Sequence, residues 1–206
     1  MRITLSILAL GLASACSSAP DAAPMAKPVI AVDSSSAQPG CPISRKGLPV
    51  ELLPGELKIG QSLSSDGLRG PDLKPWKTGF AGMPSLICVA PSLDTGVCQA
   101  QAEGLAKAVL PQGCSRFFVS RDLPFAQKRA LESLKLSGVS PLSDFDAGAW
   151  TKSLGLLQGD NHLAARAVIV TDAAGKVVWF QICPEVAHLP DLDKAAAELK
   201  KLAEKH

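Results

Sequence analysis

The sequence predicts an α/β domain with a central mixed β-sheet flanked by helices. Four short apolar runs have the length and composition of buried strands. They lie at residues 85–90, 116–119, 167–171 and 176–182. Three amphipathic segments between or after these runs have helical periodicity. They lie at residues 97–110, 127–136 and 191–205. Strands that alternate with helices are typical of the α/β class.

The remaining elements follow from local signals. Residues 48–53 followed by Pro54-Gly55 predict an N-terminal β-hairpin, and residues 147–154 predict a short helix. Residues 172–175 (DAAG) form a turn between the last two strands, which predicts a second hairpin. The final helix carries Leu192, Ala196, Leu199 and Leu202 on one face. The resulting order βαβ…ββα is that of a thioredoxin-like fold.

The start of the chain has the pattern of a bacterial secretory signal. Met1-Arg2 precedes an apolar run at 3–12 and an Ala-x-Ala site at 13–15, which predicts a signal peptide over residues 1–15. The run is too short to cross a bilayer, which takes about 20 residues. Cys16 directly after the cleavage point also resembles a lipoprotein box, so we expect lipidation of Cys16 and a periplasm-facing protein at the outer membrane. Without lipidation, the protein would be soluble in the periplasm.

Residues 16–40 are predicted to form the lipidated cysteine and a flexible tether, because alanine, serine and proline dominate this segment. Residues 41–206 are then long enough for a single domain with its own core. The net charge of +2 excludes a strongly basic nucleic-acid-binding protein. The three histidines, His162, His188 and His206, are too far apart in sequence for metal-ligand spacing.

The segment 91–98 (PSLDTGVC) places Thr95 three residues before Cys98, at the predicted start of a helix. Unpaired N–H groups and the positive end of the helix dipole favour a thiolate there, and only the thiolate is an effective nucleophile. The alternative interpretation is a buried structural cysteine, since cysteine is among the most frequently buried residues. Arg166 precedes an apolar strand at 167–171 and either reaches solvent or pairs with a nearby anion such as this thiolate.

Three segments together resemble the signature segments of the bacterial thiol peroxidases, in the peroxiredoxin superfamily. They are residues 91–98 (PSLDTGVC), 122–127 (DLPFAQ) and 163–166 (LAAR). The resemblance implies that Cys98 attacks the peroxide and that the Thr95 hydroxyl bonds to the sulfur and the peroxide. It implies that Arg166 activates both and that Pro91 shields the nucleophile from water. It also implies a homodimer and a leaning towards alkyl and lipid hydroperoxides.

The chain departs from the family pattern after the second segment. Many thiol peroxidases carry a resolving cysteine there, whereas the matching position in this chain is Leu131. Cys88 and Cys183 lie in or at the ends of apolar strands and are expected in the core. Cys41 and Cys114 lie outside these strands and remain candidates for a substitute resolving cysteine. Otherwise an external thiol or a thioredoxin-like reductant completes the cycle.

The predicted function is therefore a thiol-dependent peroxidase of the cell envelope that reduces hydrogen peroxide and organic hydroperoxides. A cysteine sulfenic acid is the expected intermediate, and this chemistry requires no metal or organic cofactor. The alternative is a non-catalytic envelope lipoprotein of the same fold with a binding or structural role. A disulfide exchanger or a copper chaperone is disfavoured, because no two cysteines have Cys-x-x-Cys or Cys-x-x-x-Cys spacing.

Overall fold

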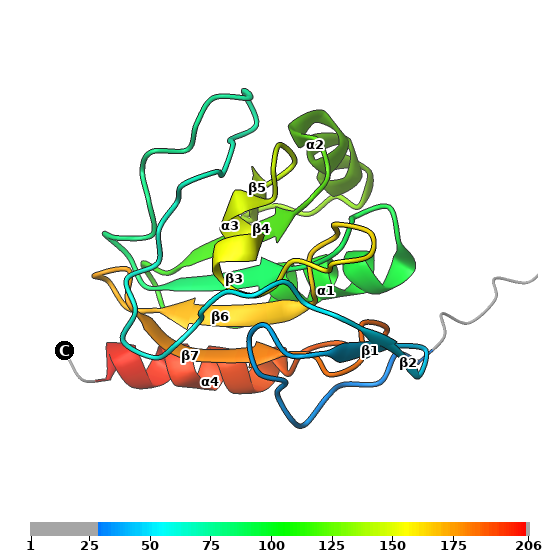
Figure 1. Ribbon diagram of the computed structural model, residues 1–206. Helices are drawn as coiled ribbons and strands as arrows, with labels where there is room; N and C mark the ends of the chain where they lie inside the picture. The colour runs from blue at the N-terminus through cyan, green and yellow to red at the C-terminus, as the bar shows by residue number, and fades with distance from the viewer. Residues whose placement is uncertain (1–28, 205–206) are drawn as a thin grey trace, which may run out of the picture.

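The computed structural model describes residues 29–204, which form a sheet with helices on both faces (Figure 1). The sheet has five strands in the order β5-β4-β3-β6-β7. They are β3 (Ser85–Val89), β4 (Ser115–Ser120), β5 (Ser140–Ser143), β6 (Ala167–Thr171) and β7 (Val177–Ile182). β3 pairs in parallel with β4 and antiparallel with β6, so the sheet is mixed, as predicted.

Two hydrophobic clusters cover the two faces of this sheet. One face packs against α1 (Gly96–Lys107), α2 (Pro124–Ser133) and α4 (Leu192–Ala203), whose apolar residues share a cluster with Leu86, Cys88 and Val168. The other face carries α3 (Ala149–Ser153), with Trp150 in its core, and an N-terminal hairpin. The central strands β3 and β6 are buried on both faces, which explains why they read as continuous apolar runs in the sequence.

Strand pairing brings Arg166 close to the start of α1. Val89 at the end of β3 lies opposite Ala167 at the beginning of β6. The chain continues from β3 through residues 90–95 into α1, and Arg166 directly precedes β6. Two segments that are distant in sequence therefore meet at one end of the sheet.

Three local predictions are corrected by the structure. The N-terminal hairpin turns at Lys46-Gly47, between β1 (Ile43–Arg45) and β2 (Leu48–Val50), and not at Pro54-Gly55. β5 was not predicted, because it is a short edge strand that contains a proline. α2 begins at Pro124, three residues before the predicted start, because proline is well suited to the first turn of a helix.

The segment before Cys41 is attached to the domain as far back as Ala31. The Leu189 N–H donates to the Ala31 oxygen, and the Ala37 N–H donates to the Ile182 oxygen. Gly40 likewise donates to Gly155. Because of these bonds, the predicted boundary at residue 41 is too late and residues 31–40 belong to the folded unit. The predicted signal peptide, Cys16 and the tether up to residue 28 lie outside the described residues.

Candidate functional site

Cys98 is the third residue of α1, and Thr95 is the residue that caps the start of this helix. A threonine at this position commonly accepts a backbone N–H. Here the Thr95 side chain makes no such capping bond, and its hydroxyl lies 3.0 Å from the Cys98 sulfur, with a longer 3.4 Å contact to the Ser92 oxygen. The hydroxyl has one proton to donate, and the sulfur is the nearer acceptor.

The Arg166 side chain is 2 % exposed and points at the same sulfur. Its Nη2 lies 3.3 Å from Cys98 Sγ, its Nη1 donates to Gln101 Oε1 at 2.7 Å, and its Nε donates to the Val186 oxygen at 2.9 Å. Within residues 29–204, no ion pair joins Arg166 to a carboxylate. The permanent positive charge therefore faces the sulfur without a competing anion.

Gln101 is a site residue that the sequence analysis did not identify. It is fully buried in α1, one helical turn after Cys98. Its Nε2 donates to the oxygens of Val89 and Ala167, at the paired ends of β3 and β6, while its Oε1 accepts from Arg166. Gln101 thus fixes the guanidinium relative to the sheet. A polar residue on the apolar face of the predicted helix is the signal that could have identified it.

Cys98 itself has no exposed surface. Its two polar partners, Thr95 and Arg166, line a pocket of about 220 Å³ together with Pro91. Cys98 is not in the lining, and its hydrogen bonds to Thr95 and Arg166 connect the sulfur to two residues that are.

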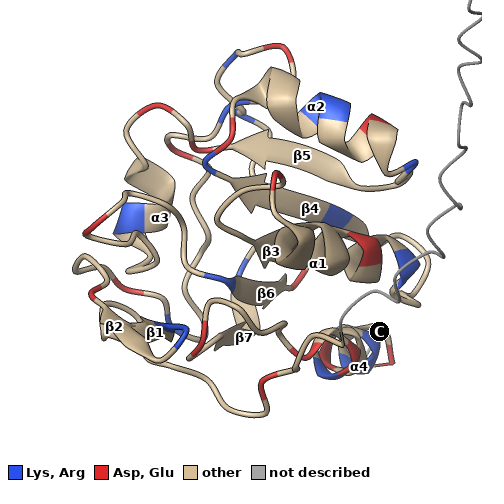
Figure 2. Ribbon diagram, turned by 90° about the vertical axis from the view of Figure 1, so that its right-hand side faces the viewer, with Lys and Arg blue, Asp and Glu red and all other residues tan. Residues whose placement is uncertain are grey.

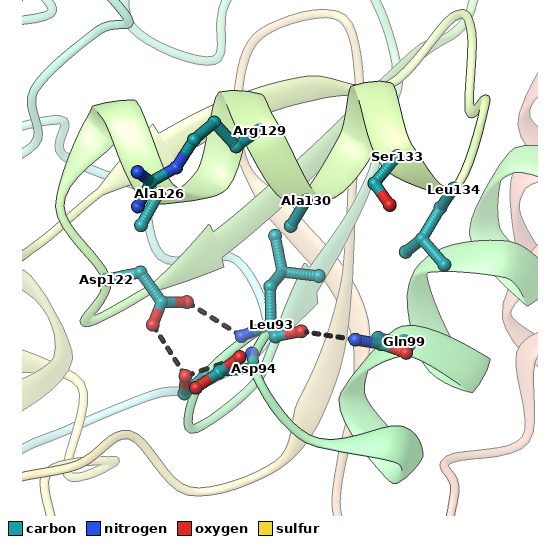
Figure 3. A pocket seen from close by; sticks show the side chains of 10 residues that line it. Leu93, Asp94, Gln99, Asp122, Ala126, Arg129, Ala130, Ser133 and Leu134 are labelled. Carbon is teal, nitrogen blue, oxygen red and sulfur yellow. Dashed lines mark hydrogen bonds between the residues drawn. The ribbon is translucent and has the colours of Figure 1, made fainter. Parts of the chain in front are cut away.

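The loop between Pro91 and Thr95 is held in place by the segment that precedes α2 (Figure 3). The Asp122 carboxylate accepts from the Ser92 hydroxyl at 2.6 Å and from the Leu93 N–H at 2.7 Å. Gln99 Nε2 in turn donates to the Leu93 oxygen. A pocket of about 480 Å³ lies beside this loop, under α2, and Cys98 is not in its lining. This contact explains the position of Asp122 at the start of the second signature segment.

The other cysteines in the described part of the chain are free thiols in different surroundings. Cys88 and Cys183 are buried, as predicted, and burial raises the pKa of Cys88 to about 12 and that of Cys183 well above its usual value. Burial also raises the pKa of the half-buried Cys114, although Arg116 opposes this effect. Cys41 is exposed. Leu131 packs into the same hydrophobic cluster as Cys98.

Charges and metal ligands add no second site in the described chain. Acidic and basic residues are interspersed over the elements in Figure 2. Within residues 29–204, no three His, Cys, Asp or Glu side chains converge in a metal-binding arrangement.

Comparison with known proteins identifies the family. The redoxin family model matches residues 66–199. A thiol peroxidase of Aquifex aeolicus is 35 % identical over 165 residues, which is 78 % of this chain and 97 % of that protein. A thiol peroxidase of Halalkalibacterium halodurans is 36 % identical over 160 residues, with 77 % and 96 % covered. The crystal structure of a peroxiredoxin-like protein from Aquifex aeolicus superposes with a TM-score of 0.73 at 32 % identity, over 81 % of this chain and 99 % of that one. The chain thus belongs to the thiol peroxidases of the redoxin family, with the thioredoxin-like fold that the sequence predicted.

Proposed function

We propose that Cys98 is the nucleophile with which this thiol peroxidase reduces hydrogen peroxide and organic hydroperoxides. The Cys98 thiolate attacks one peroxide oxygen, so that an S–O bond forms while the O–O bond breaks. The sulfur loses two electrons and becomes a sulfenic acid, and the departing oxygen takes a proton and leaves as water or an alcohol. The observation that carries this proposal is the pair of donors at 3.0 and 3.3 Å from one sulfur.

The neighbours of Cys98 supply the groups that this step needs. Arg166 stabilises the thiolate and then the negative charge that develops on the departing oxygen. Thr95 is both donor and acceptor, so its hydroxyl can turn from the sulfur to the incoming peroxide. Pro91 lines the same pocket and has no N–H to bind water there, in agreement with a shielding role.

Trapping the intermediate tests the assignment. The purified protein is treated with one equivalent of hydrogen peroxide in the presence of dimedone, and the adduct is located by peptide mass spectrometry. We expect the adduct on Cys98, with Cys88 unmodified because its pKa of about 12 leaves almost no thiolate at neutral pH. Peroxide consumption without any adduct or oxidation at Cys98 would remove this residue from the mechanism.

We further propose that an external thiol returns the sulfenic acid to the thiol, with release of water and formation of the partner's disulfide. By the resemblance to the thiol peroxidases, the position of the usual resolving cysteine matches Leu131, which has no thiol. Cys114 precedes β4 at the opposite end of the sheet from Cys98. Five strand residues span about 16 Å at roughly 3.3 Å each, whereas a disulfide needs Cα atoms about 4.4–6.8 Å apart. In the folded protein, Cys114 is therefore too distant to resolve Cys98.

Cys41 is the remaining internal candidate, because it is exposed at the N-terminal side of β1. A Cys41→Ser variant separates the two routes. If an external thiol serves, this variant turns over with dithiothreitol at the wild-type rate, and peroxide-treated wild type contains no Cys41–Cys98 peptide. A Cys41–Cys98 disulfide in the wild type, together with slower turnover in the variant, would assign resolution to Cys41.

We also propose that the protein is exported and anchored in the cell envelope through a lipid on Cys16. The support is the leader pattern at residues 1–16. Among the described residues 29–204, no helix has the length and apolar character of a membrane span. Detergent phase partitioning after expression in a bacterium with the lipoprotein pathway tests the anchor. Wild type is expected in the detergent phase and Cys16→Ala in the aqueous phase.

A homodimer completes the proposal. Leu123 and Phe125, at the start of α2, are 50 % and 55 % exposed, and paired apolar side chains of this kind are typical of interfaces. Light scattering of the wild type should give twice the monomer mass, and Phe125→Glu should lower it.

A further inference from the structure

The pocket above Cys98 extends away from the sulfur to the turn of the N-terminal hairpin. Its lining combines Thr95 and Arg166, which contact the sulfur, with Arg45 and Lys46 at the turn of the hairpin. Between them its wall is largely apolar, with Val97, Leu163, Val186 and Ala187 in the lining. Hydrogen peroxide needs no such wall. A pocket with polar groups at both ends and an apolar middle matches an organic molecule with two polar ends.

The charged residues in this lining are all cations. Each of the three nitrogens of the Arg166 guanidinium already has one partner, which is the sulfur, Gln101 or Val186. Arg45 forms an ion pair with Asp160 at 3.0 Å and also bonds to Gln158. The Lys46 ammonium group is different, because no side chain within residues 29–204 pairs with it. A free positive charge therefore stands at the outer end of the pocket.

The backbone of Lys46 is held firmly although its side chain is unpaired. The Glu185 carboxylate accepts from the N–H groups of Lys46 and Gly47 at 2.9 and 3.2 Å, and from the Ser44 hydroxyl at 2.6 Å. Lys46 also has φ 52°, a left-handed conformation that lysine seldom adopts. The negative charge of Glu185 is spread over these donors, and Glu185 is not in the pocket lining. The hairpin thus presents one lysine at the pocket mouth from a fixed backbone.

We propose, as an extension of the function above, that the pocket selects organic hydroperoxides that carry an anionic group, such as a carboxylate, and that Lys46 binds this group. The hydroperoxide end reaches Arg166 and Thr95, where the O–O bond breaks as described. The alkyl body lies along the apolar wall, and the carboxylate remains at the hairpin and takes no part in the reaction. Lys46 acts only in binding, so its effect falls on discrimination between substrates.

A matched pair of substrates tests this role. The rate constant kcat/KM is measured for a fatty-acid hydroperoxide and for its methyl ester, below the concentration at which either aggregates. Each value is divided by the same variant's value with hydrogen peroxide. For the wild type we expect the acid to be preferred by roughly threefold to fivefold, the size of one partly exposed ion pair. The preference should shrink as salt is added.

Two substitutions at Lys46 and one control complete the design. Lys46→Asn, which suits a left-handed backbone, should bring the acid-to-ester ratio close to one, and Lys46→Glu should reverse it. Lys176→Gln is the control. Lys176 is exposed in the turn between β6 and β7, at the end of β6 opposite Arg166, and its replacement should keep the wild-type acid-to-ester ratio.

A wild-type ratio of one, or an unchanged ratio in both Lys46 variants, overturns the anionic-substrate inference while turnover of hydrogen peroxide still supports the proposed function. Loss of all peroxide turnover in the wild type overturns the proposed function itself.

Discussion

Cys88 and Cys98 lie in the same hydrophobic cluster, and neither has any exposed surface, yet their surroundings differ. Cys88 is in the middle of β3, where burial raises its pKa to about 12 even though Gln101 and Arg166 oppose this effect. The Cys98 sulfur is in the first turn of a helix and receives a hydroxyl and a guanidinium in direct contact. Burial alone therefore does not distinguish the proposed nucleophile, Cys98, from Cys88. The donors that replace water do.

The same guanidinium acts on both sulfurs, but its direction distinguishes them. Arg166 Nη2 is within hydrogen-bond distance of Cys98, whereas its influence on Cys88 is that of a nearby charge. Gln101 and Val186 fix this direction from two different elements. The contrast between the two cysteines thus depends on three bonds to one side chain, and substitutions at these bonds can sharpen or remove it.

The largest expected effect is the loss of activity in Cys98→Ser. A serine hydroxyl is not ionised at neutral pH and is a poor nucleophile toward peroxide, so we expect peroxide consumption at the level of the uncatalysed reaction. Cys88→Ala is the matched control, since it removes a buried sulfur from the same cluster. It should keep most of the activity and lose some thermal stability. Equal activity losses in the two variants would mean that the cluster as a whole, and not Cys98, determines reactivity.

Arg166→Lys should lower kcat/KM by about two to three orders of magnitude, as is typical when a preorganised donor at the reacting atoms is removed. Lysine keeps the charge, but one ammonium group cannot serve the sulfur, Gln101 and Val186 in the same geometry. The measurement is the steady-state rate, with a thermal melt as a check of folding.

Arg116→Lys is the control for the loss of a guanidinium. Arg116 donates to the oxygens of Leu105 and Ala108, far from Cys98 along the sheet. This variant should melt at a lower temperature and retain its rate. If Arg166→Lys stayed within threefold of the wild type, the guanidinium geometry would not matter for the reaction.

The residues in contact with the Cys98 sulfur could be predicted from the sequence, but the residue that holds Arg166 in place, Gln101, could not. Thr95 and Cys98 belong to one helix start, a local pattern that a sequence displays directly. Arg166 was assigned by resemblance, and its place follows from the pairing of β3 with β6. Gln101 was missed because its role depends on contacts with two strand ends, and a polar residue on an apolar helix face marks the position but not these contacts. The attachment of residues 31–40 was missed for the same reason, since their partners lie beyond residue 150.

Thr95→Val should reduce the rate by about tenfold to a hundredfold, which corresponds to the roughly 1.5–3 kcal/mol that a hydrogen bond to a charged group contributes. Valine has nearly the shape of threonine but no hydroxyl, so the sulfur would keep Arg166 as its single polar contact. Thr95→Ser restores the hydroxyl and should recover most of the rate. If valine and serine gave equal rates, the hydroxyl would have no part in the difference between Cys98 and Cys88.

The smallest effect is expected at Glu185, which precedes Val186 in the pocket wall beside Arg166. Burial raises the pKa of this carboxyl, but bonds from Ser44, Ala187, Lys46 and Gly47 outweigh burial and lower the pKa to about 2. Because the folded pKa lies below the ordinary value of 4.5, the stabilisation is complete above pH 4.5 and is lost as the pH falls towards 2.

Glu185→Gln keeps the shape but removes the charge. At pH 7 it should lower the Tm by about 2–4 °C, the shift expected for roughly 1 kcal/mol in a protein of this size. The difference from the wild type should shrink below pH 4, as the wild-type carboxyl takes up its proton. Because Val186 follows Glu185 and accepts from Arg166 Nε, a small decrease in peroxidase rate should accompany the lower Tm. A Tm at pH 7 equal to that of the wild type would show that Glu185 stabilises this wall through its shape, and that charge enters the site only through Arg166.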